Sequence, residues 1–224
     1  EAINREFSFR VRHGRPWGIL KWAMSLDGRI GLPNGCSKWI TDVPARNSVH
    51  QIRSNCDAVI VGGGTVRSDD PLLTSRGKSN FEPLRVVFSR TLNLPKSAKL
   101  WNTTIAKTII AYGPDGNEDF LSDFPSGPEK LLLNSTDPTE LLISLGKKGC
   151  NKILWECGPL LATSAIKANC VQELIVFVAP KLLGGKSAMS PLESFGFESI
   201  NSTYKLQHSF LERKGEDLCW SLLL

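Results

Sequence analysis

Short apolar runs recur along the chain and alternate with polar stretches rich in Gly, Pro, Asp and Ser. Several runs are dominated by β-branched residues, and each is too short for a full amphipathic helix. Seven of them predict buried strands: 17–24, 58–61, 84–88, 109–112, 131–133, 152–155 and 173–179.

The segments between several of these strands carry helix signals. A cap at Thr41 or Asp42, followed by Pro44 in the first turn, predicts a helix ahead of the second strand. Two later helices are expected over 137–149 and 160–167, where Asp-Pro and Gly-Pro pairs open apolar stretches. This alternation of strands and helices favours a largely parallel sheet.

The C-terminal region has a different pattern. Residues 204–212 and 218–224 predict two strands joined by a polar turn at 214–217, which is an antiparallel hairpin. With 224 residues and no internal repeat, the chain is expected to form one domain with a substantial core. The predicted fold class is α/β, with a central mixed, mostly parallel sheet flanked by helices and a C-terminal antiparallel hairpin.

The charge pattern narrows the range of partners. Lys and Arg number 27 against 22 Asp and Glu, and the net charge of +5 favours anionic ligands such as a phosphorylated metabolite or nucleotide. The basic residues are scattered, so nucleic-acid binding is not expected. No apolar stretch approaches 18 residues, so no membrane span is predicted. The chain opens at Glu1 rather than Met, so its sequence does not reveal the cellular location.

The cysteines and histidines form no recognisable metal or nucleophile pattern. The six cysteines include no C-x-x-C pair, and several lie in apolar strings where free thiols are commonly buried. A structural metal is therefore not expected, and a reducing compartment is the simpler interpretation. His13, His50 and His208 are interpreted as structural or exposed, because they match no Ser/His/Asp or zinc-deaminase arrangement.

Two glycine clusters are candidate anion sites, since each lies at the end of a predicted strand. The run 62–64 precedes Thr65 at a helix start, but it also fits a tight turn and lacks the G-x-G-x-x-G spacing of dinucleotide sites. Gly158-Pro159 is the stronger candidate, because proline in the first turn leaves the next helix amides free to face a pyrophosphate. A plain strand-to-helix turn is the alternative.

Charged residues in apolar settings mark a second part of the candidate site. Lys21 interrupts one predicted strand and Glu156 ends another, and both suit the edge of a cleft because an unpaired buried charge is costly. Lys21 also fits an outward strand position. Arg53 and Arg76 can clamp a phosphate through paired N–H donors, although most arginines are simply solvated. Trp39 can stack on a ring or pack in the core.

Four strings together resemble one known family. They are residues 20–29, 37–41 (SKWIT), 69–76 (DDPLLTSR) and 179–185 (APKLLGG). Over nearly all its length the chain resembles the reductase half of the bifunctional deaminase-reductase proteins of riboflavin biosynthesis. The resemblance implies a dihydrofolate-reductase-like fold, NADPH as hydride donor and a phosphorylated pyrimidine substrate. That substrate would be 5-amino-6-(5-phosphoribosylamino)uracil, whose ribosyl C1′ is reduced to give a ribityl chain.

The same resemblance implies roles for individual positions. It implies substrate contacts at Ser37, Arg53, Leu73, Arg76 and Glu156. It implies NADPH contacts at Ala23, Trp39, Thr65, Asp69, Ser89, Gly158, Pro159, Leu160, Leu161, Ala162, Thr163 and Ser164. The candidate catalytic residues are Lys21, Asp27 and Glu156. Of these, Lys21 and Asp27 would orient the ribosyl group and supply protons, because opening a ribosyl ring needs protons as well as hydride.

The extent of the resemblance sets further expectations. Residues 1–16 look like a connecting segment from a missing upstream deaminase-like domain, and residues 17–224 look like the reductase domain, expected in a homodimer. Several positions are similar to the plant proteins, which implies a plastid stroma location for a plant protein and a cytoplasmic one otherwise. Cys157 adds bulk where the family commonly has Gly or Ala. Two alternatives stay open: a fungal-type or other pterin-like reductase of this fold, and a non-catalytic binding module.

Overall fold

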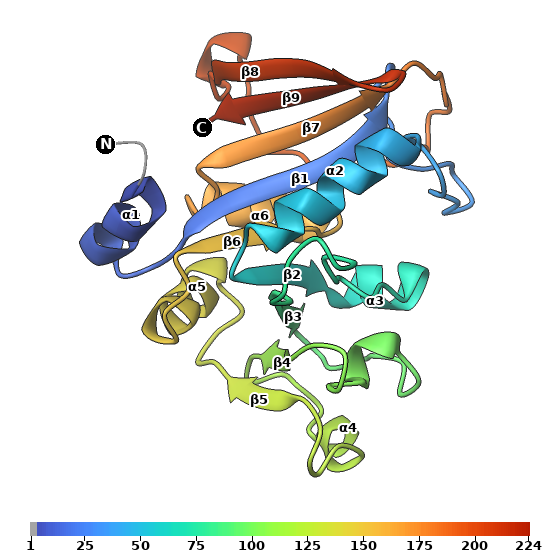
Figure 1. Ribbon diagram of the computed structural model, residues 1–224. Helices are drawn as coiled ribbons and strands as arrows, with labels where there is room; N and C mark the ends of the chain where they lie inside the picture. The colour runs from blue at the N-terminus through green and yellow to red at the C-terminus, as the bar shows by residue number, and fades with distance from the viewer. Residues whose placement is uncertain (1–3) are drawn as a thin grey trace.

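The computed structural model describes residues 4–224, without the side chains of residues 208 and 209. A nine-stranded sheet forms its centre, in the order β5-β4-β3-β2-β6-β1-β7-β9-β8 (Figure 1). All neighbours from β5 to β7 run parallel, and β9 runs antiparallel to both β7 and β8. The strands are β1 (Trp17–Ser25), β2 (Ala58–Gly62), β3 (Leu84–Ser89), β4 (Thr108–Tyr112), β5 (Glu129–Leu132), β6 (Lys152–Trp155), β7 (Glu173–Ala179), β8 (Gln207–Lys214) and β9 (Asp217–Leu223).

Capping residues start two of the main helices. Asp42 accepts a hydrogen bond from the Val43 amide at 2.8 Å, and Asp137 accepts one from the Thr139 amide at 2.7 Å. Among residues 4–224, no helix is long and apolar enough to cross a membrane. The helices are α1 (Arg5–His13), α2 (Val43–Ser54), α3 (Gly63–Asp69), α4 (Asp119–Ser122), α5 (Pro138–Lys147) and α6 (Pro159–Lys167), with 3-10 turns at Lys99–Trp101 and Ile200–Ser202.

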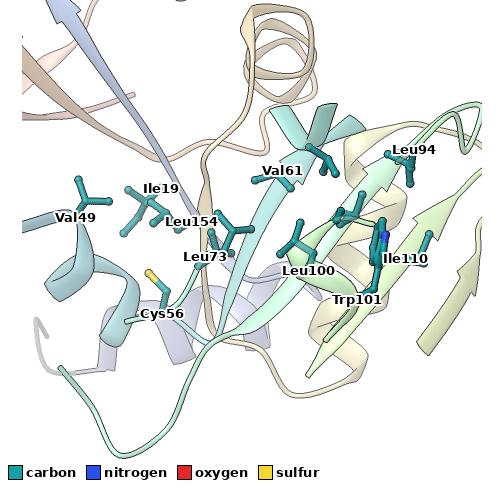
Figure 2. Packing of buried hydrophobic residues seen from close by; sticks show 14 of the residues in the cluster. Ile19, Val49, Cys56, Val61, Leu73, Leu94, Leu100, Trp101, Ile110 and Leu154 are labelled. Atoms are coloured by element: carbon teal, nitrogen blue, oxygen red, sulfur yellow. The ribbon is translucent and has the colours of Figure 1, made fainter. Parts of the chain in front are cut away.

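The sheet separates two hydrophobic cores, and β2 shows how. Side chains alternate across a strand, so Val59 and Val61 join one core while Ala58 and Ile60 join the other. The first core takes residues from α2, α3 and α4, and Figure 2 shows part of it. The second core is closed by apolar residues of α5 and α6. Helices therefore cover both faces of the sheet, and the carboxyl ends of its parallel strands stay available for a site.

The predicted fold class is confirmed, since the sheet is mixed and mostly parallel and ends in an antiparallel hairpin. The hairpin turn is tighter than the predicted 214–217, because Gly215 takes a left-handed φ of 69° and both strands run closer to the turn. The segment expected only to connect domains contains α1. Helix α1 buries no side chain fully, and most of its residues are polar or charged, so no apolar run marks it in the sequence.

Arg85, near the amino end of β3, is fully buried. Its Nη2 donates to the backbone carbonyls of Leu100 at 3.0 Å, Asn102 at 2.8 Å and Ala106 at 2.7 Å. The guanidinium therefore holds the segment that enters β4 against the sheet, because buried carbonyls need donors that water cannot supply.

Candidate active site

Strand register brings Lys21 and Glu156 together at the carboxyl edge of the sheet. β1 and β6 run parallel with Leu20 opposite Trp155, so the next residues along the two strands are neighbours. Lys21 Nζ lies 3.8 Å from Glu156 Oε2, and the two side chains are 16% and 11% exposed. Two charges that stand far apart in the sequence thus form a nearly buried pair.

Arg53 reaches this pair from the last turn of α2. Its Nε donates to Glu156 Oε1 at 2.5 Å, and its Nη2 donates to Oε2 at 3.0 Å. This is the bidentate geometry in which a guanidinium binds a carboxylate most strongly. Glu156 therefore faces two cations in a region that water barely reaches.

The electrostatics of the cluster follow from burial and from its own charges. Burial alone would raise the pKa of Glu156, but the charges of Arg53 and Lys21 outweigh burial and lower that pKa to about 2. For Lys21, burial and the Arg53 charge lower the pKa, while Glu156 opposes them. Lys21 thus releases its proton more readily than an ordinary lysine, beside a carboxylate that stays ionised.

His50 belongs to the same cluster. Its Nδ1 lies 3.4 Å from Arg53 Nη1, and because a guanidinium only donates, Nδ1 is the acceptor. Burial first, and then the charges of Arg53 and Arg76, lower the pKa of His50. Sequence patterns indicated a structural or exposed role for His50. Its spacing of three residues from Arg53 on one helix was the signal that could have placed it in the site.

The segment after α3 carries an unusual backbone next to the cluster. Asp70, Leu73 and Arg76 all have positive φ values, of 42°, 55° and 52°. Such conformations cost energy for residues with side chains and concentrate at functional sites. The Thr74 carbonyl accepts from Arg53 Nη1 at 3.1 Å. Leu73 points into the core with 2% exposure (Figure 2), so it presents backbone rather than side chain to a ligand.

The start of α6 is an open helix N-terminus. Gly158 is the N-cap and Pro159 the first helical residue. The Ala162 amide donates to the Gly158 carbonyl at 3.0 Å, so the earlier amides of Leu160 and Leu161 have no acceptor inside the helix. A Cβ built at Gly158 would meet nothing within 4 Å. Free amides and the helix dipole make this turn suitable for an anion.

The ends of β2 and β3 lie beside that turn. A Cβ built at Gly62 would lie 3.4 Å from the Leu161 side chain, and one at Gly63 would lie 3.2 Å from Ser89 Oγ. α3 begins at Gly63, two residues before Thr65. The structure thus gathers Thr65, Ser89 and the start of α6, although they are distant in the sequence.

The expected cofactor positions on α6 differ in their accessibility. Leu160 is 73% exposed, and Pro159 and Ser164 are partly exposed. Ala162 and Thr163 are buried, and Thr163 Oγ1 accepts from the Glu193 amide at 2.8 Å. The side chains of these two residues are buried inside the protein, whereas the free amides at the start of α6 belong to Leu160 and Leu161.

β1 and the loop between β1 and α2 carry three more expected contacts. Trp39 is 62% exposed, and the Arg46 guanidinium lies 4.6 Å from its ring centroid. Ser37 is partly buried, and Ala23 lies on β1 on the same face as Lys21. Lys38 Nζ donates to the Asp69 carbonyl at 3.1 Å and so ties this loop to the end of α3.

Asp27 has a different environment from the other charged candidates. Its Oδ1 accepts from Ser25 Oγ at 2.5 Å and from the Leu183 amide at 3.0 Å, and its Oδ2 accepts from the Gly184 amide at 2.7 Å. These bonds, with Ser25 first, lower the pKa of Asp27 to about 2. The carboxylate ties the turn after β1 to the loop that follows β7.

A mostly parallel sheet with a glycine-capped helix and a nearly buried ion cluster at one edge defines an α/β protein with a candidate small-molecule site at that edge. The model of the RibD C-terminal domain family matches residues 16–220, and the chain belongs to that family. The riboflavin biosynthesis protein RibD of Synechocystis is 41% identical over 218 residues, covering 97% of this chain and 59% of that protein. The chloroplastic riboflavin biosynthesis protein PYRR of Arabidopsis thaliana is 37% identical, covering 96% of this chain and 36% of that protein.

Two solved structures show the same architecture. Acinetobacter baumannii RibD matches with a TM-score of 0.86 and 29% identity, over 99% of this chain and 62% of that one. A Thermotoga maritima diaminohydroxyphosphoribosylaminopyrimidine deaminase/5-amino-6-(5-phosphoribosylamino)uracil reductase matches with a TM-score of 0.84 and 26% identity, over 98% and 59%. The chain thus spans roughly a third to three fifths of the length of these relatives.

Proposed function

We propose that this chain uses NADPH to reduce the ribosyl group of 5-amino-6-(5-phosphoribosylamino)uracil to the ribitylamino product in riboflavin biosynthesis. The observation that carries the proposal is the nearly buried Lys21–Glu156–Arg53 cluster, which lies at the same sheet edge as the open helix start at Gly158. The name of the Thermotoga maritima relative, which includes this reductase, supports it.

The open turn at the start of α6 fits the pyrophosphate of NADPH, because free helix amides favour an anion and no Cβ fills the space at Gly158. Trp39, Thr65, Asp69 and Ser89 are proposed to complete the cofactor site with Ala23 and the run 158–164. Bound NADPH supplies the hydride that reaches C1′ of the sugar. The residues of this chain align the two reactants and exclude water.

Substrate binding is proposed at the neighbouring part of the edge. Arg76 is exposed on the strained loop and suits the ribose phosphate. Ser37 and the Leu73 backbone lie on the two loops that flank the cluster, and Glu156 accepts hydrogen bonds from the sugar or the ring. In this proposal the sugar lies beside Lys21.

Lys21 is the proposed proton donor. When hydride reaches C1′, the bond from C1′ to the ring oxygen breaks and that oxygen takes up a proton. Burial and the Arg53 charge lower the pKa of Lys21, which favours this transfer. Asp27 is a poorer candidate, because three hydrogen bonds already hold its ionised form.

Assembly and location complete the proposal. β8 is an edge strand of the sheet, and Phe210 and Leu211 on it are 54% and 49% exposed, which supports pairing of two copies in a homodimer. The plant relative is named chloroplastic, which supports a plastid location for a plant protein.

NADPH oxidation by the purified chain tests the function, with the substrate generated in situ by a separate deaminase. Turnover that depends on the deaminase supports the proposal. Turnover without the deaminase points instead to the fungal-type order, in which reduction precedes deamination. Folded protein with no turnover in either reaction points to a binding module or to another pterin-like substrate.

A further inference from the structure

An open pocket of about 440 Å³ lies between α1 and the start of β1. Its wall on the strand side is Trp17, the first residue of β1, which pairs with Lys152 at the start of β6. The pocket therefore lies at the amino edge of the sheet, and Figure 1 shows α1 beside that end of β1. Its volume is typical of small-molecule pockets, and it is separate from the candidate active site at the carboxyl edge.

Polar contacts hold α1 in place and so keep the pocket formed. Glu6 Oε1 lies 2.8 Å from Lys152 Nζ, and Arg10 Nε donates to Asn151 Oδ1 at 2.7 Å. Both partners belong to the start of β6 or the residue before it. The walls of the pocket are thus arranged before any ligand arrives, which lowers the cost of binding.

Aromatic side chains form one part of the pocket. The ring centroid of Phe9 lies 4.3 Å from that of His13 and 5.3 Å from that of Trp17. All three rings line the pocket. Neighbouring rings offer a surface on which a planar group can stack.

Basic side chains form the other part. The Arg5 guanidinium is balanced by Glu6 at 3.6 Å and Glu173 at 3.3 Å. Arg12 is exposed, and no carboxylate oxygen of residues 4–224 lies within 4 Å of its guanidinium or of the His13 ring. Arg12 and His13 therefore keep donors for an anion, and a guanidinium suits the oxygens of a phosphate.

The Trp17 indole adds an unpaired donor to the wall. Its Nε1 is buried, and no described residue accepts a hydrogen bond from it. Buried donors are nearly always paired, because an unpaired one keeps its full desolvation cost. This N–H therefore points to an acceptor from outside the chain.

We propose that this pocket binds a small aromatic phosphate of the mononucleotide class. The base stacks on the rings of Phe9, His13 and Trp17, and the phosphate accepts from Arg12 and His13. Ser8, which also lines the pocket, offers a hydroxyl to the sugar. This inference goes beyond the proposed reductase function and does not rest on it.

Fluorine NMR of the chain labelled with 5-fluorotryptophan tests the proposal with AMP as the probe. The six tryptophans include Trp17 in the pocket and Trp39 at the candidate active site, and Trp17→Phe and Trp39→Phe assign their signals. AMP is expected to shift the Trp17 signal with saturation. Adenosine and inorganic phosphate should each bind at least about 10-fold more weakly, since each lacks one half of the ligand.

Variants of the exposed residues identify the groups that bind. Arg12→Met and Phe9→Leu are each expected to weaken AMP binding about 10-fold at Trp17, and Arg12→Lys should lose less because it keeps the charge. Arg213→Met is the matched control, since this arginine is 67% exposed and lies on β8. It should bind AMP like the wild type.

Three results would overturn the proposal. AMP that shifts Trp39 alone, or no tryptophan at all, shows that the pocket binds no mononucleotide. Inorganic phosphate that binds as tightly as AMP removes the aromatic half of the ligand. An equal loss in Arg213→Met and Arg12→Met shows attraction by overall charge and no site. The reductase assay plays no part in this titration, so the proposed function and this inference fail separately.

Discussion

Arg85 and Arg53 are both withdrawn from water, yet they lie in different regions and bind different partners. Arg85, near the amino end of β3, donates to the backbone carbonyls of Leu100, Asn102 and Ala106. Arg53, at the carboxyl edge of the sheet, holds the carboxylate of Glu156 in a fork.

The acceptor, rather than burial, separates a structural arginine from one at a site. Carbonyls carry partial charge and belong to a chain segment, so a cation among them fixes that segment. A nearly buried carboxylate carries a full charge that must be compensated, and such perturbed charges gather at functional sites. The first arrangement stabilises the fold, and the second is the one proposed to serve the reaction.

The largest effect is expected from Arg85→Met. The carbonyls of Leu100, Asn102 and Ala106 lose their common donor, and the free energy of unfolding should fall by about 4 kcal/mol. Urea unfolding followed by circular dichroism measures this loss, with Arg12→Met as the exposed control. The kcat of the folded variant should stay near that of the wild type. If the Arg85→Met variant kept its stability but lost kcat, Arg85 would belong to the site and not to the fold.

The next effect is expected from Glu156→Gln. The amide keeps one oxygen acceptor for Arg53 but removes the charge beside Lys21, so kcat/KM should fall about 100-fold, or ~3 kcal/mol. Steady-state NADPH oxidation measures the loss, and urea unfolding of the same variant is the control. If stability falls like that of Arg85→Met while kcat/KM holds, the cluster is structural.

Sequence patterns predicted the fold well because the fold depends on local signals. The apolar run 58–61 became β2, and Asp42 was one of two expected caps. Lys21 and Glu156 were singled out because each interrupts or ends an apolar run. Their adjacency was beyond the sequence, since it arises only from the register of β1 and β6.

The residues missed from the sequence share one cause. Arg85 looked like any arginine in a strand, because its carbonyl partners come from a later segment without regular pattern. The engagement of Arg53 by Glu156 depends on how α2 crosses the sheet, and His50 follows Arg53 into the site because the two lie three residues apart on α2. Motifs identify residue types, whereas the Arg53–Glu156 pair spans 103 positions and the Arg85 carbonyls lie 15 to 21 positions away, so both sets of contacts require the tertiary structure.

A smaller effect is expected from Arg76→Ala, the third arginine of the comparison. Loss of an exposed phosphate contact should raise the substrate KM about 10-fold, or ~1.4 kcal/mol, and leave NADPH affinity unchanged. Gly158→Val is the reciprocal variant, because its Cβ meets nothing in the protein and should weaken NADPH binding alone. Steady-state KM values and fluorescence titration of NADPH check both. If Arg76→Ala instead weakened NADPH binding and Gly158→Val raised the substrate KM, Arg76 would belong to the cofactor site and Gly158 to the substrate site.

The smallest effect is expected from Asp27→Asn, which extends the comparison to carboxylates. The pKa of Asp27 is about 2, below its ordinary 3.8, so the unfolded chain binds the proton more readily. Its stabilisation is present above pH 3.8 and is lost as pH falls through 2. The Tm of Asp27→Asn should therefore lie below that of the wild type at neutral pH, and the gap should close in acid. Backbone amides and the Ser25 hydroxyl hold Asp27, whereas cations hold Glu156. Asp27 is therefore expected to affect stability rather than catalysis, and kcat should change by less than about twofold. A large fall in kcat with an unchanged Tm would make Asp27 the proton donor.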